Sequence, residues 1–340
     1  MRASKGPIVT VVTPVFNGEA YLAECIESVL GQTYDRWEYV IVNNQSTDRS
    51  LEIALQYAQK DPRIRVMTNE HFVDVMRSQN IAFRQVSPES TYCKMVHADD
   101  WLFPDCLRLM VELAEGHPSV GIAGAYRLDD TVVTPSGLPY PCTSMPGREL
   151  CRAILLGGPG VFGSNSSILF RSEYVRSRER FLDETDFHGD TGVCYEILQN
   201  CDFGFVHQVL TYTRRHPEAQ TKFAESMNTY LAGQLRHLQR YGPIYLSRDD
   251  YDGRLRWLLA EYYRFLGRSL LEPGGDEIWR YHEAALASLG HRVSPGRLLM
   301  TLLTYWQRAV TNPIYAGRLA GRFLWRLISP GADVPPKGVR

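Results

Sequence analysis

The sequence predicts an α/β protein whose mostly parallel sheet is flanked by helices, followed by a helical region at the C-terminal end. Short apolar runs rich in β-branched residues alternate with amphipathic helical patterns up to about residue 127. Alternation of this kind favours βαβ units, in which each helix crosses over one face of the sheet. Beyond residue 128 the alternation stops, and from about residue 220 the pattern is helical and aromatic.

The first part of the chain supplies strands and helices of this sheet in turn. Residues 8–16, "IVTVVTPVF", are β-branched and aromatic and lead into Asn17-Gly18, which indicates a buried strand and a turn. Apolar residues at helical spacing follow, and Ser46 or Thr47 stands where the N-cap of the next helix is expected. The expected strands are 8–16, 37–42, 64–68, 91–98 and 120–127, and the helices between them include 73–86 and 104–115.

The second part has a different organisation. Residues 134–147, "TPSGLPYPCTSMPG", are rich in Pro, Gly and Ser and predict a loop. A Gly-rich turn and a strand are expected over 157–171, a helix over 190–200 and a strand over 202–215. We therefore expect one domain at 1–218, made of the halves 1–128 and 129–218, and a helical region at 219–340.

The composition is that of a soluble globular protein, with 44% apolar and 22% charged residues. The formal net charge of −1 argues against a nucleic-acid partner. Seven cysteines without a C-x-x-C pair argue against a disulfide framework or a zinc site and favour free thiols in a reducing compartment. The sequence shows neither the long apolar region of a signal peptide nor a window apolar enough to span a membrane. The expected location is the cytoplasm.

Polar side chains follow three of the expected strands at the point where each strand ends. Thr13 to Asn17 end the first, Asn43 and Asn44 end the second, and Asp99 and Asp100 end the fourth. Ligands of parallel α/β sheets bind beyond the carboxyl ends of the strands. We therefore expect these three polar groups to meet at one edge of the sheet.

The pair Asp99-Asp100, in "MVHADDW", is suited to a hard divalent cation. Mg²⁺ and Mn²⁺ are commonly held by one or two carboxylates and share their other positions with phosphate and water. Such an ion would also relieve the repulsion between two adjacent charges. The alternative is a capping aspartate beside a solvated one. The sequence has neither the G-x-G-x-x-G nor the G-x-x-x-x-G-K-[ST] phosphate loop, so a nucleotide would be bound by other means.

Three motifs together resemble family 2 glycosyltransferases, which are nucleotide-sugar-dependent enzymes of the GT-A fold. They are "TPVFNGEAYLAECIESVLGQTY", "WEYVIVNNQSTDRSLEIA" and "HADDW", in this order, and the resemblance covers about residues 7–215. It implies Asp100 as the main metal ligand, with Asp99 on the metal or the ribose, and Phe16 against the base. The nucleotide-binding residues that it implies are Thr13, Pro14, Phe16, Asn17, Asn43, Asn44, Arg77, Asn80 and Asp99.

Three features in this part of the chain depart from the family pattern. Many relatives carry Asp where this chain has Asn43 and where it has His97. A neutral His97 could ligate a metal, although a packing role is the simpler expectation. Arg77 lies three residues before Asn80 in "MRSQNIAF", whereas the corresponding family residues are adjacent.

The resemblance also implies an acceptor side. "ERFLDETDFHGDTGVCYEIL" places Asp190 at the position of the catalytic base, although an Asp before an apolar helix is also a common N-cap. Asp183, Glu184 and Asp186 are alternatives. Asn165, Ser166 and His188 are expected near the acceptor. Arg214 and His216, in "TYTRRHPE", match an Arg-x-His that lies near the diphosphate in relatives, the alternative being a solvated basic turn.

The C-terminal arm, residues 294–328, mixes arginines with large apolar residues. Arg318, Arg322 and Arg326 share one helical face. A basic amphipathic helix of this kind either packs on the catalytic domain or lies on an anionic membrane surface, and we expect packing. In the second case the protein would sit at the inner face of the membrane and the acceptor would be lipid-linked.

The expected function is an inverting glycosyltransferase that uses Mg²⁺ or Mn²⁺ and a nucleotide-sugar donor, by default a UDP-sugar. The acceptor would be a glycan or a lipid-linked glycan in the synthesis of a bacterial surface or exopolysaccharide. A sugar-phosphate nucleotidyltransferase is a second hypothesis, which the missing Gly-rich loop disfavours. A third is a degenerate scaffold that binds nucleotide or glycan without catalysis, which Asn43 and His97 leave open.

Overall fold

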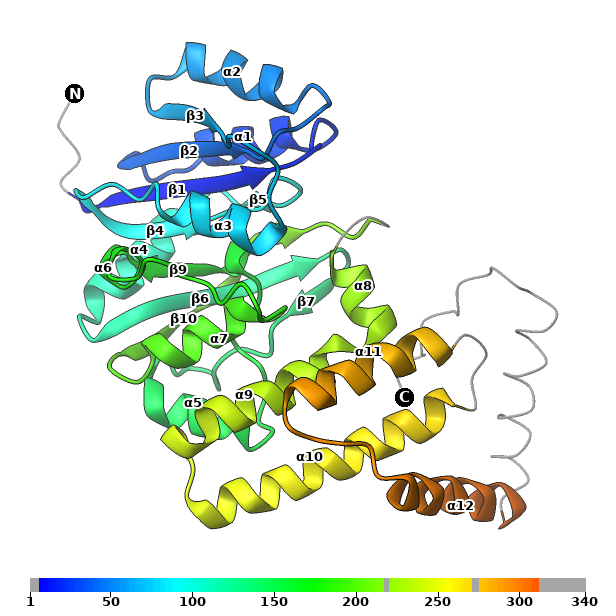
Figure 1. The fold of residues 1–340 in the computed structure, drawn as a ribbon. Coiled ribbons are helices and arrows are strands. Elements are labelled where there is room, and N and C mark those ends of the chain that lie inside the picture. Colours follow the sequence, from blue (N-terminus) through cyan, green and yellow to red (C-terminus); the bar gives the residue numbers. More distant parts are fainter. Residues whose placement is uncertain (1–5, 217–219, 271–274, 312–340) are drawn as a thin grey trace. The chain divides into compact units, whose positions relative to one another are not determined.

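The computed structural model describes residues 6–216, 220–270 and 275–311 of the chain (Figure 1). The chain forms two compact units. The first comprises Met1–Lys222 and Arg240–Ser247, and the second comprises Phe223–Gln239 and Arg248–Arg340. The first unit thus includes a short later segment, Arg240–Ser247, in addition to its main part.

The first unit is built on a single ten-stranded sheet, with the order β3-β2-β1-β4-β9-β6-β10-β5, in which β7 pairs with β6 and β8 with β10. The pairs β1–β2, β2–β3, β1–β4 and β6–β10 are parallel. β9 is antiparallel to both β4 and β6, between which it lies. The strands are β1 (Ile8–Val15), β2 (Trp37–Asn43), β3 (Ile64–Thr68), β4 (Ser90–Met95), β5 (Trp101–Leu102), β6 (Val120–Asp129), β7 (Val132–Thr134), β8 (Ser144–Pro146), β9 (Ile168–Arg171) and β10 (Asp202–Thr213).

Helices cover both faces of this sheet, because alternate strand residues point to opposite sides. Val12, Val40 and Met95 belong to one apolar cluster, whereas Val11, Ile41 and Tyr92 belong to another on the opposite face. The first cluster includes residues of α3, α5, α6 and α7, and the second includes residues of α1, α2 and α4. The helices are α1 (Leu22–Leu30), α2 (Ser50–Lys60), α3 (Val75–Phe83), α4 (Cys106–Gly116), α5 (Gly147–Leu155), α6 (Ser172–Arg176) and α7 (Gly189–Ile197).

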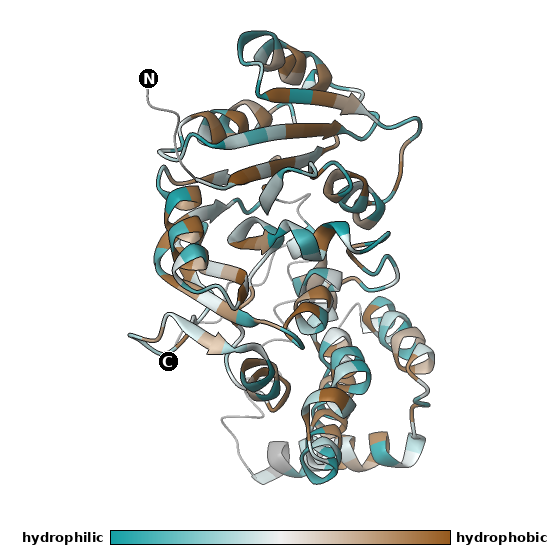
Figure 2. Ribbon diagram, turned by 90° about the vertical axis from the view of Figure 1, so that its left-hand side faces the viewer, coloured by the Kyte–Doolittle hydropathy of each residue, from teal (hydrophilic) through white to brown (hydrophobic). Residues whose placement is uncertain are grey.

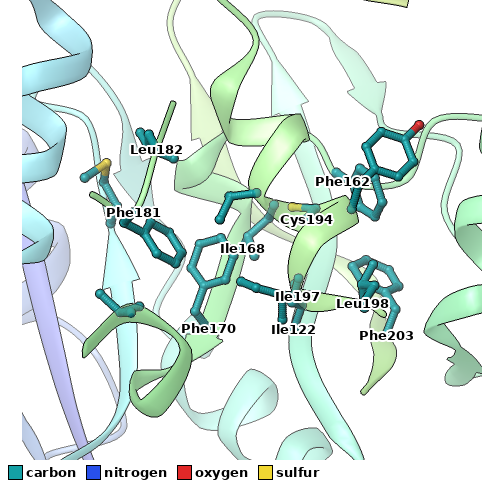
Figure 3. Close-up of a cluster of buried hydrophobic side chains, with 14 of the residues drawn as sticks. Ile122, Phe162, Ile168, Phe170, Phe181, Leu182, Cys194, Ile197, Leu198 and Phe203 are labelled. Carbon is teal, nitrogen blue, oxygen red and sulfur yellow. The ribbon is translucent and has the colours of Figure 1, made fainter. Parts of the chain in front are cut away.

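The core of the second half is aromatic. The Phe170 and Phe181 rings meet edge to face with centroids 5.0 Å apart, and Phe83 of α3 packs 4.4 Å from Phe181. Ile197 and Leu198 belong to the same cluster (Figure 3). Figure 2 shows brown, hydrophobic residues along the strands, interrupted by pale and teal, more hydrophilic ones. This packing fixes α7 and the segment around Phe181 to the sheet, which matters for the site described below.

The α/β prediction is confirmed, and several local predictions are not. The residues expected as a loop at 134–147 contain the short strand β8, and α5 follows immediately without having been expected. α2 begins at Ser50 with no side-chain cap, so neither Ser46 nor Thr47 is its N-cap. Instead, the Ser46 hydroxyl accepts a hydrogen bond from the Asn17 amide, which ties the ends of β1 and β2 together.

The helices that follow β10 are α8 (Gln220–Met227), α9 (Thr229–Tyr245), α10 (Arg248–Ser269), α11 (Gly275–Ser288) and α12 (Pro295–Thr311). Within the second unit, the buried His282 contacts the Tyr262 hydroxyl at 2.6 Å and the Met227 carbonyl at 2.7 Å. Of the helices that the structure describes, none is long and apolar enough to cross a membrane. The first half of the predicted amphipathic arm forms α12, whereas residues 312–328, with Arg318, Arg322 and Arg326, lie outside the described residues.

Candidate active site

The carboxyl ends of β1 and β2 form one side of the site. Asn17 adopts a left-handed conformation, with φ of 50°, which short polar side chains tolerate. Its side-chain oxygen accepts from the Thr47 amide at 2.8 Å. The Asn43 side-chain oxygen accepts from the Ser46 amide at 3.1 Å. Two predicted nucleotide residues, Asn17 and Asn43, therefore shape a shared loop at the sheet edge.

Asn44 and Thr13 are buried and hydrogen-bonded within the protein. The Asn44 amide donates to the Val73 carbonyl at 2.8 Å, and its oxygen accepts from the Asn69 side chain at 2.8 Å. Asn44 thus fastens the loop after β3. The Thr13 hydroxyl contacts the Tyr39 hydroxyl and the Val96 carbonyl, both at 2.8 Å. The structure therefore places these two predicted nucleotide residues as supports of the edge.

Phe16 is the predicted nucleotide residue with a large exposed apolar surface at this edge. Its ring is 48% exposed and lies 4.7 Å from the ring of Phe72, centroid to centroid. Pro14, two residues earlier in β1, is half-buried. An exposed aromatic face beside a polar loop is suited to stacking against a nucleobase.

Asp99 and Asp100 lie at the same edge, beyond β4, where the chain after β10 contacts them. The Nε2 of His216 lies 3.0 Å from Oδ2 of Asp99. The Arg214 amide donates to Oδ1 of Asp100 at 3.3 Å. A Cβ built on Gly18 would lie 3.5 Å from the Cβ of Ala98, so the turn after β1 adjoins the same segment. The three polar groups predicted from the strand ends therefore meet.

The Arg214 guanidinium is surrounded by aromatic rings. It lies 4.6 Å from the centroid of Tyr21 and 5.2 Å from that of Trp101. Trp101 is stacked on Tyr212, with centroids 3.6 Å apart. A terminal nitrogen of Arg214 also pairs with Glu24 of α1. These contacts fix the direction in which the chain leaves β10 and so place His216 against Asp99.

A buried turn holds His97 in place through hydrogen bonds. The turn, η1 (Asn165–Ser167), places the Ser166 hydroxyl 3.1 Å from the His97 amide and 3.3 Å from its Nδ1. Lys94, which is fully buried in β4, donates to the Ser166 carbonyl at 2.6 Å and to the Ile168 carbonyl at 3.2 Å. Ser166 therefore supports His97, and Lys94 holds Ser166 in place.

Three carboxylates affect the pKa of His97. Burial lowers the pKa of His97, but the Asp100 carboxylate and the charges of Asp99 and Asp190 together raise it above its usual value. The Nδ1 of His97 lies 3.7 Å from Oδ2 of Asp100. Among the described residues, none provides a hydrogen-bond partner for the buried Nε2 atom. Asp190 is thus electrostatically coupled to the edge that carries the carboxylate pair.

Asp190 lies in the first turn of α7, which begins directly after the predicted acceptor residue His188. One oxygen of Asp190 accepts from the Thr191 amide at 2.7 Å. The same N–H also lies 3.1 Å from the His188 carbonyl, so this carboxylate oxygen shares a donor at the helix start. The bond leaves the second oxygen of the carboxylate for other chemistry. Asn165, another predicted acceptor residue, donates to Oε1 of Gln79 at 2.9 Å.

Arg77 and Asn80 bind the segment at 182–184, and no hydrogen bond or ion pair that the structure describes joins them to the carboxylate pair. The Asn80 amide donates to the Leu182 carbonyl at 2.9 Å, and its oxygen accepts from the Leu182 amide at 2.8 Å. Arg77 pairs with Glu184 at 3.2 Å and with Asp74 at 3.3 Å. Both residues therefore connect α3 to the region that precedes α7.

The donor set at Asp99 and Asp100 fits a hard divalent cation. Within the described residues, no group of three or more His, Cys, Asp and Glu side chains could hold a metal by itself. Mg²⁺ and Mn²⁺ do not need such a group, because phosphate and water complete their coordination. The side chain of Asp99 is 33% exposed, and His216 beside it is a borderline ligand that Mn²⁺ accepts.

Three contributors to this edge were not singled out in the sequence. Lys94 has a visible signal, because a lysine inside the apolar run "TYCKMV" is unusual in a buried strand. Glu24 and Tyr21 have none, because their relation to Arg214 depends on the long-range pairing of β10 with β6 and β5. All seven cysteines are free, as the sequence predicts.

The sequence matches known proteins in its N-terminal half. Glycosyl transferase family 2 matches residues 10–177. The glycosyltransferase GlyA of Streptococcus pneumoniae is 31% identical over 124 residues, which are 36% of this chain and 17% of GlyA. The O-antigen biosynthesis protein RfbC of Myxococcus xanthus is 35% identical over 108 residues, 31% of this chain and 8% of RfbC. The chain thus spans less than a fifth of the length of each of these two relatives.

Solved structures extend the likeness of fold to nearly the whole chain. S. aureus TarS 1-349 in complex with UDP-GlcNAc superposes with a TM-score of 0.61 at 16% identity, covering 94% of this chain and 92% of that one. The mannosyltransferase PcManGT of Pyrobaculum calidifontis, in complex with GDP-Man and Mn²⁺, gives 0.54 at 14% identity, covering 97% and 89%. The fold is therefore GT-A, and residues 10–177 of the chain belong to glycosyl transferase family 2.

Proposed function

We propose that the protein transfers a sugar, with inversion, from a nucleotide-diphosphate sugar to a hydroxyl of a glycan or lipid-linked acceptor. The observation that carries this proposal is the meeting of Asp99 and Asp100 with Arg214 and His216, at the sheet edge that also carries the exposed ring of Phe16. This edge offers stacking for a base, carboxylates for a cation and basic groups for a diphosphate. UDP is the nucleotide that we propose first.

The donor would lie across the carboxyl ends of β1, β2 and β4. Phe16 would stack on the base, and the Asn17–Thr47 loop would line the nucleotide. Asp99 and Asp100, with His216, would hold Mg²⁺ or Mn²⁺, and the bound ion would neutralise charge on the departing diphosphate. The Arg214 guanidinium would bind phosphate oxygens if it exchanged its pairing with Glu24 for the ligand.

Asp190 would be the base. Its carboxylate takes the proton of the acceptor hydroxyl as that oxygen bonds to the anomeric carbon from the side opposite the nucleotide. The bond from the anomeric carbon to the phosphate oxygen breaks, and its electrons leave with the diphosphate. The bond from the Thr191 amide orients the carboxylate while one oxygen remains for the proton. A positioned base of this kind typically contributes about 10²–10⁴-fold to the rate.

The biological role that we propose is the synthesis of a bacterial surface polysaccharide or exopolysaccharide. The name of RfbC, an O-antigen biosynthesis protein, supports this class of product. A membrane-surface acceptor agrees with the basic arm predicted from the sequence at 294–328. Loss of liposome binding on deletion of 312–340 would support that contact.

A donor screen tests the proposal. The full chain is incubated with UDP- and GDP-sugars, MnCl₂ and a polysaccharide-precursor extract, and release of the free nucleotide is followed. We expect release from one donor, abolished by EDTA and lowered at least about 10²-fold by Asp190→Asn. Nucleotide release that is indifferent to Asp190→Asn would contradict the assigned base. Nucleotide triphosphate consumption with a sugar phosphate would indicate a nucleotidyltransferase instead.

A further inference from the structure

The first unit contains a cavity of about 380 Å³ beside α3 and α7. It is lined by α3 and its N-cap, by the segment at 180–185, by α7 and by the end of α9 that belongs to the same unit. The volume lies within the range of small-ligand sites. Nothing in the proposed donor site uses this cavity.

Most of the charged side chains around the cavity form ion pairs. The Arg240 guanidinium bridges Asp183 at 2.5 Å and Glu196 at 2.8 Å. Arg77, from α3, pairs with Glu184 at 3.2 Å. The cavity is therefore lined by both N–H donors and carboxylate acceptors, and their ion pairs hold them in fixed places.

Arg180 is the exception in this lining. It forms no ion pair or side-chain hydrogen bond with any residue that the structure describes, and it is exposed at the cavity. A guanidinium presents up to five N–H donors in a rigid plane. Arg180 thus offers donors to a ligand at no cost to an existing pair.

The charge balance selects the chemical class of the ligand. Four carboxylates (Asp74, Asp183, Glu184 and Glu196) and three guanidinium groups (Arg77, Arg180 and Arg240) line the cavity, so 3 − 4 gives a net charge of −1. A phosphate or a nucleotide diphosphate would need an excess of cations. A saccharide hydroxyl both donates and accepts, so neighbouring hydroxyls match paired carboxylate and guanidinium groups without carrying a charge.

The position of the cavity connects it to both halves of the proposed reaction. Gly192, Val193 and Glu196 line it from α7, whose first turn carries Asp190. Asp74 lines it from the start of α3, directly after Val73, which Asn44 ties to the end of β2. The cavity therefore lies between the helix of the proposed base and a loop fastened to the donor edge.

We propose that this cavity, between α3 and α7, is a subsite for an uncharged saccharide unit of the acceptor, with Arg180 as a specificity-determining donor. That the bound saccharide belongs to the acceptor rests on the proposed function. The binding of a neutral sugar to the cavity can be tested independently of that function. The Arg77–Glu184 and Arg240–Glu196 pairs hold the polar groups in place, and Arg180 supplies the donors that a hydroxyl pair can take.

The test measures sugar binding to the full chain by saturation-transfer NMR. The probes are the methyl glycosides of glucose, galactose, mannose and N-acetylglucosamine in both anomeric forms, with inorganic phosphate as a competitor. We expect at least one glycoside to bind the wild type and to bind Arg180→Gln about tenfold more weakly, since a hydrogen bond to a charged group is lost. Phosphate should not displace it.

Arg84→Gln is the matched control. Arg84 is also an exposed arginine with no ion pair among the described residues, but it lies at the far end of α3 and does not line the cavity. This variant should bind the glycoside as the wild type does. Equal weakening in both variants, displacement by phosphate, or no signal from any of the eight glycosides would overturn the proposal.

A parallel thermal-shift measurement with UDP, GDP and MnCl₂ distinguishes a failure of the sugar subsite from a failure of the proposed transferase function. Glycoside binding without any nucleotide effect would leave the sugar subsite standing while the proposed transferase function failed. A nucleotide effect without glycoside binding would leave the function standing while the subsite failed. Arg180→Gln should leave the nucleotide effect unchanged, because Arg180 lies outside the donor edge.

Discussion

The imidazole Nε2 of His216 lies 3.0 Å from Oδ2 of Asp99, although 117 positions separate the two residues in the chain. Asp99 follows β4, and His216 follows β10 at the other side of β9 and β6. The contact exists because Arg214 is held among Tyr21, Trp101 and Tyr212. The carboxylate pair is thus completed by a segment from the second half of the domain.

This relationship predicts that His216→Ala weakens the use of the donor. Loss of the imidazole removes a borderline ligand and a partner of Asp99, so the apparent affinity for Mn²⁺ in nucleotide release should fall about tenfold. His117→Ala is the control, since His117 caps the far end of α4. Unchanged Mn²⁺ dependence in His216→Ala would show that the contact is only structural.

Asp190→Asn should separate chemistry from donor binding. The amide cannot take a proton, so kcat should fall about 10²–10⁴-fold, whereas the nucleotide affinity should change little. The helix start keeps its partner, because the amide oxygen still accepts from Thr191. Steady-state kinetics and nucleotide titration of the same preparation test this. An equal loss of kcat and of nucleotide affinity would show that Asp190 takes part in donor binding.

Asn80→Ala should lower stability more than it lowers nucleotide affinity. The Asn80 side chain bonds both the amide and the carbonyl of Leu182 and also contacts Glu184 at 3.1 Å. Its removal leaves buried backbone groups unpaired, which costs about 2–3 kcal/mol in the free energy of unfolding. Urea unfolding checks the first part. A wild-type unfolding curve with lost UDP binding would restore Asn80 as a nucleotide contact.

Lys94→Met should change how stability depends on pH. Burial lowers the pKa of Lys94 below its usual 10.5, against the charges of Cys106, Asp100 and Cys93. Between the lowered pKa and 10.5 the unfolded chain binds more protons than the folded one, so this lysine makes stability rise with pH. The free energy of unfolding of the wild type relative to Lys94→Met should therefore increase over that alkaline window.

Urea unfolding of both proteins from pH 7 to 10.5 measures this difference, whose slope is at most about 1.4 kcal/mol per pH unit for one proton. Subtraction of the variant removes the contributions of buried tyrosines and cysteines, which have the opposite sign. A difference that stays constant over the range would contradict the lowered pKa of Lys94.

The strand ends were predictable because they depend on local patterns. The apolar run before Asn17 and the run before Asp99 each end where the structure ends or nearly ends a strand, and parallel topology then brings the polar groups together. The placement of β9 between β4 and β6 was not predictable, since an antiparallel strand inserted from later in the chain leaves no local signal.

The roles of individual side chains were harder to predict than their positions. Asn44 and Asn80 are polar residues near strand and helix ends, and the sequence cannot distinguish a ligand contact from a bond to a distant backbone group. In the structure their amides bond Val73 and Leu182. The partners lie 29 and 102 positions away, which only tertiary packing determines.

The most direct test concerns the carboxylate of Asp100, which we propose as the main ligand of the metal ion that binds the diphosphate. UDP and GDP are titrated calorimetrically into the wild type and into Asp100→Asn, each with MnCl₂ and with EDTA. We predict that the wild type binds one nucleotide at least about tenfold more tightly with Mn²⁺ than with EDTA, and that Asp100→Asn loses this difference while remaining folded. Nucleotide binding by the wild type that is equally tight in EDTA, or a Mn²⁺ effect that survives in Asp100→Asn, would contradict the account.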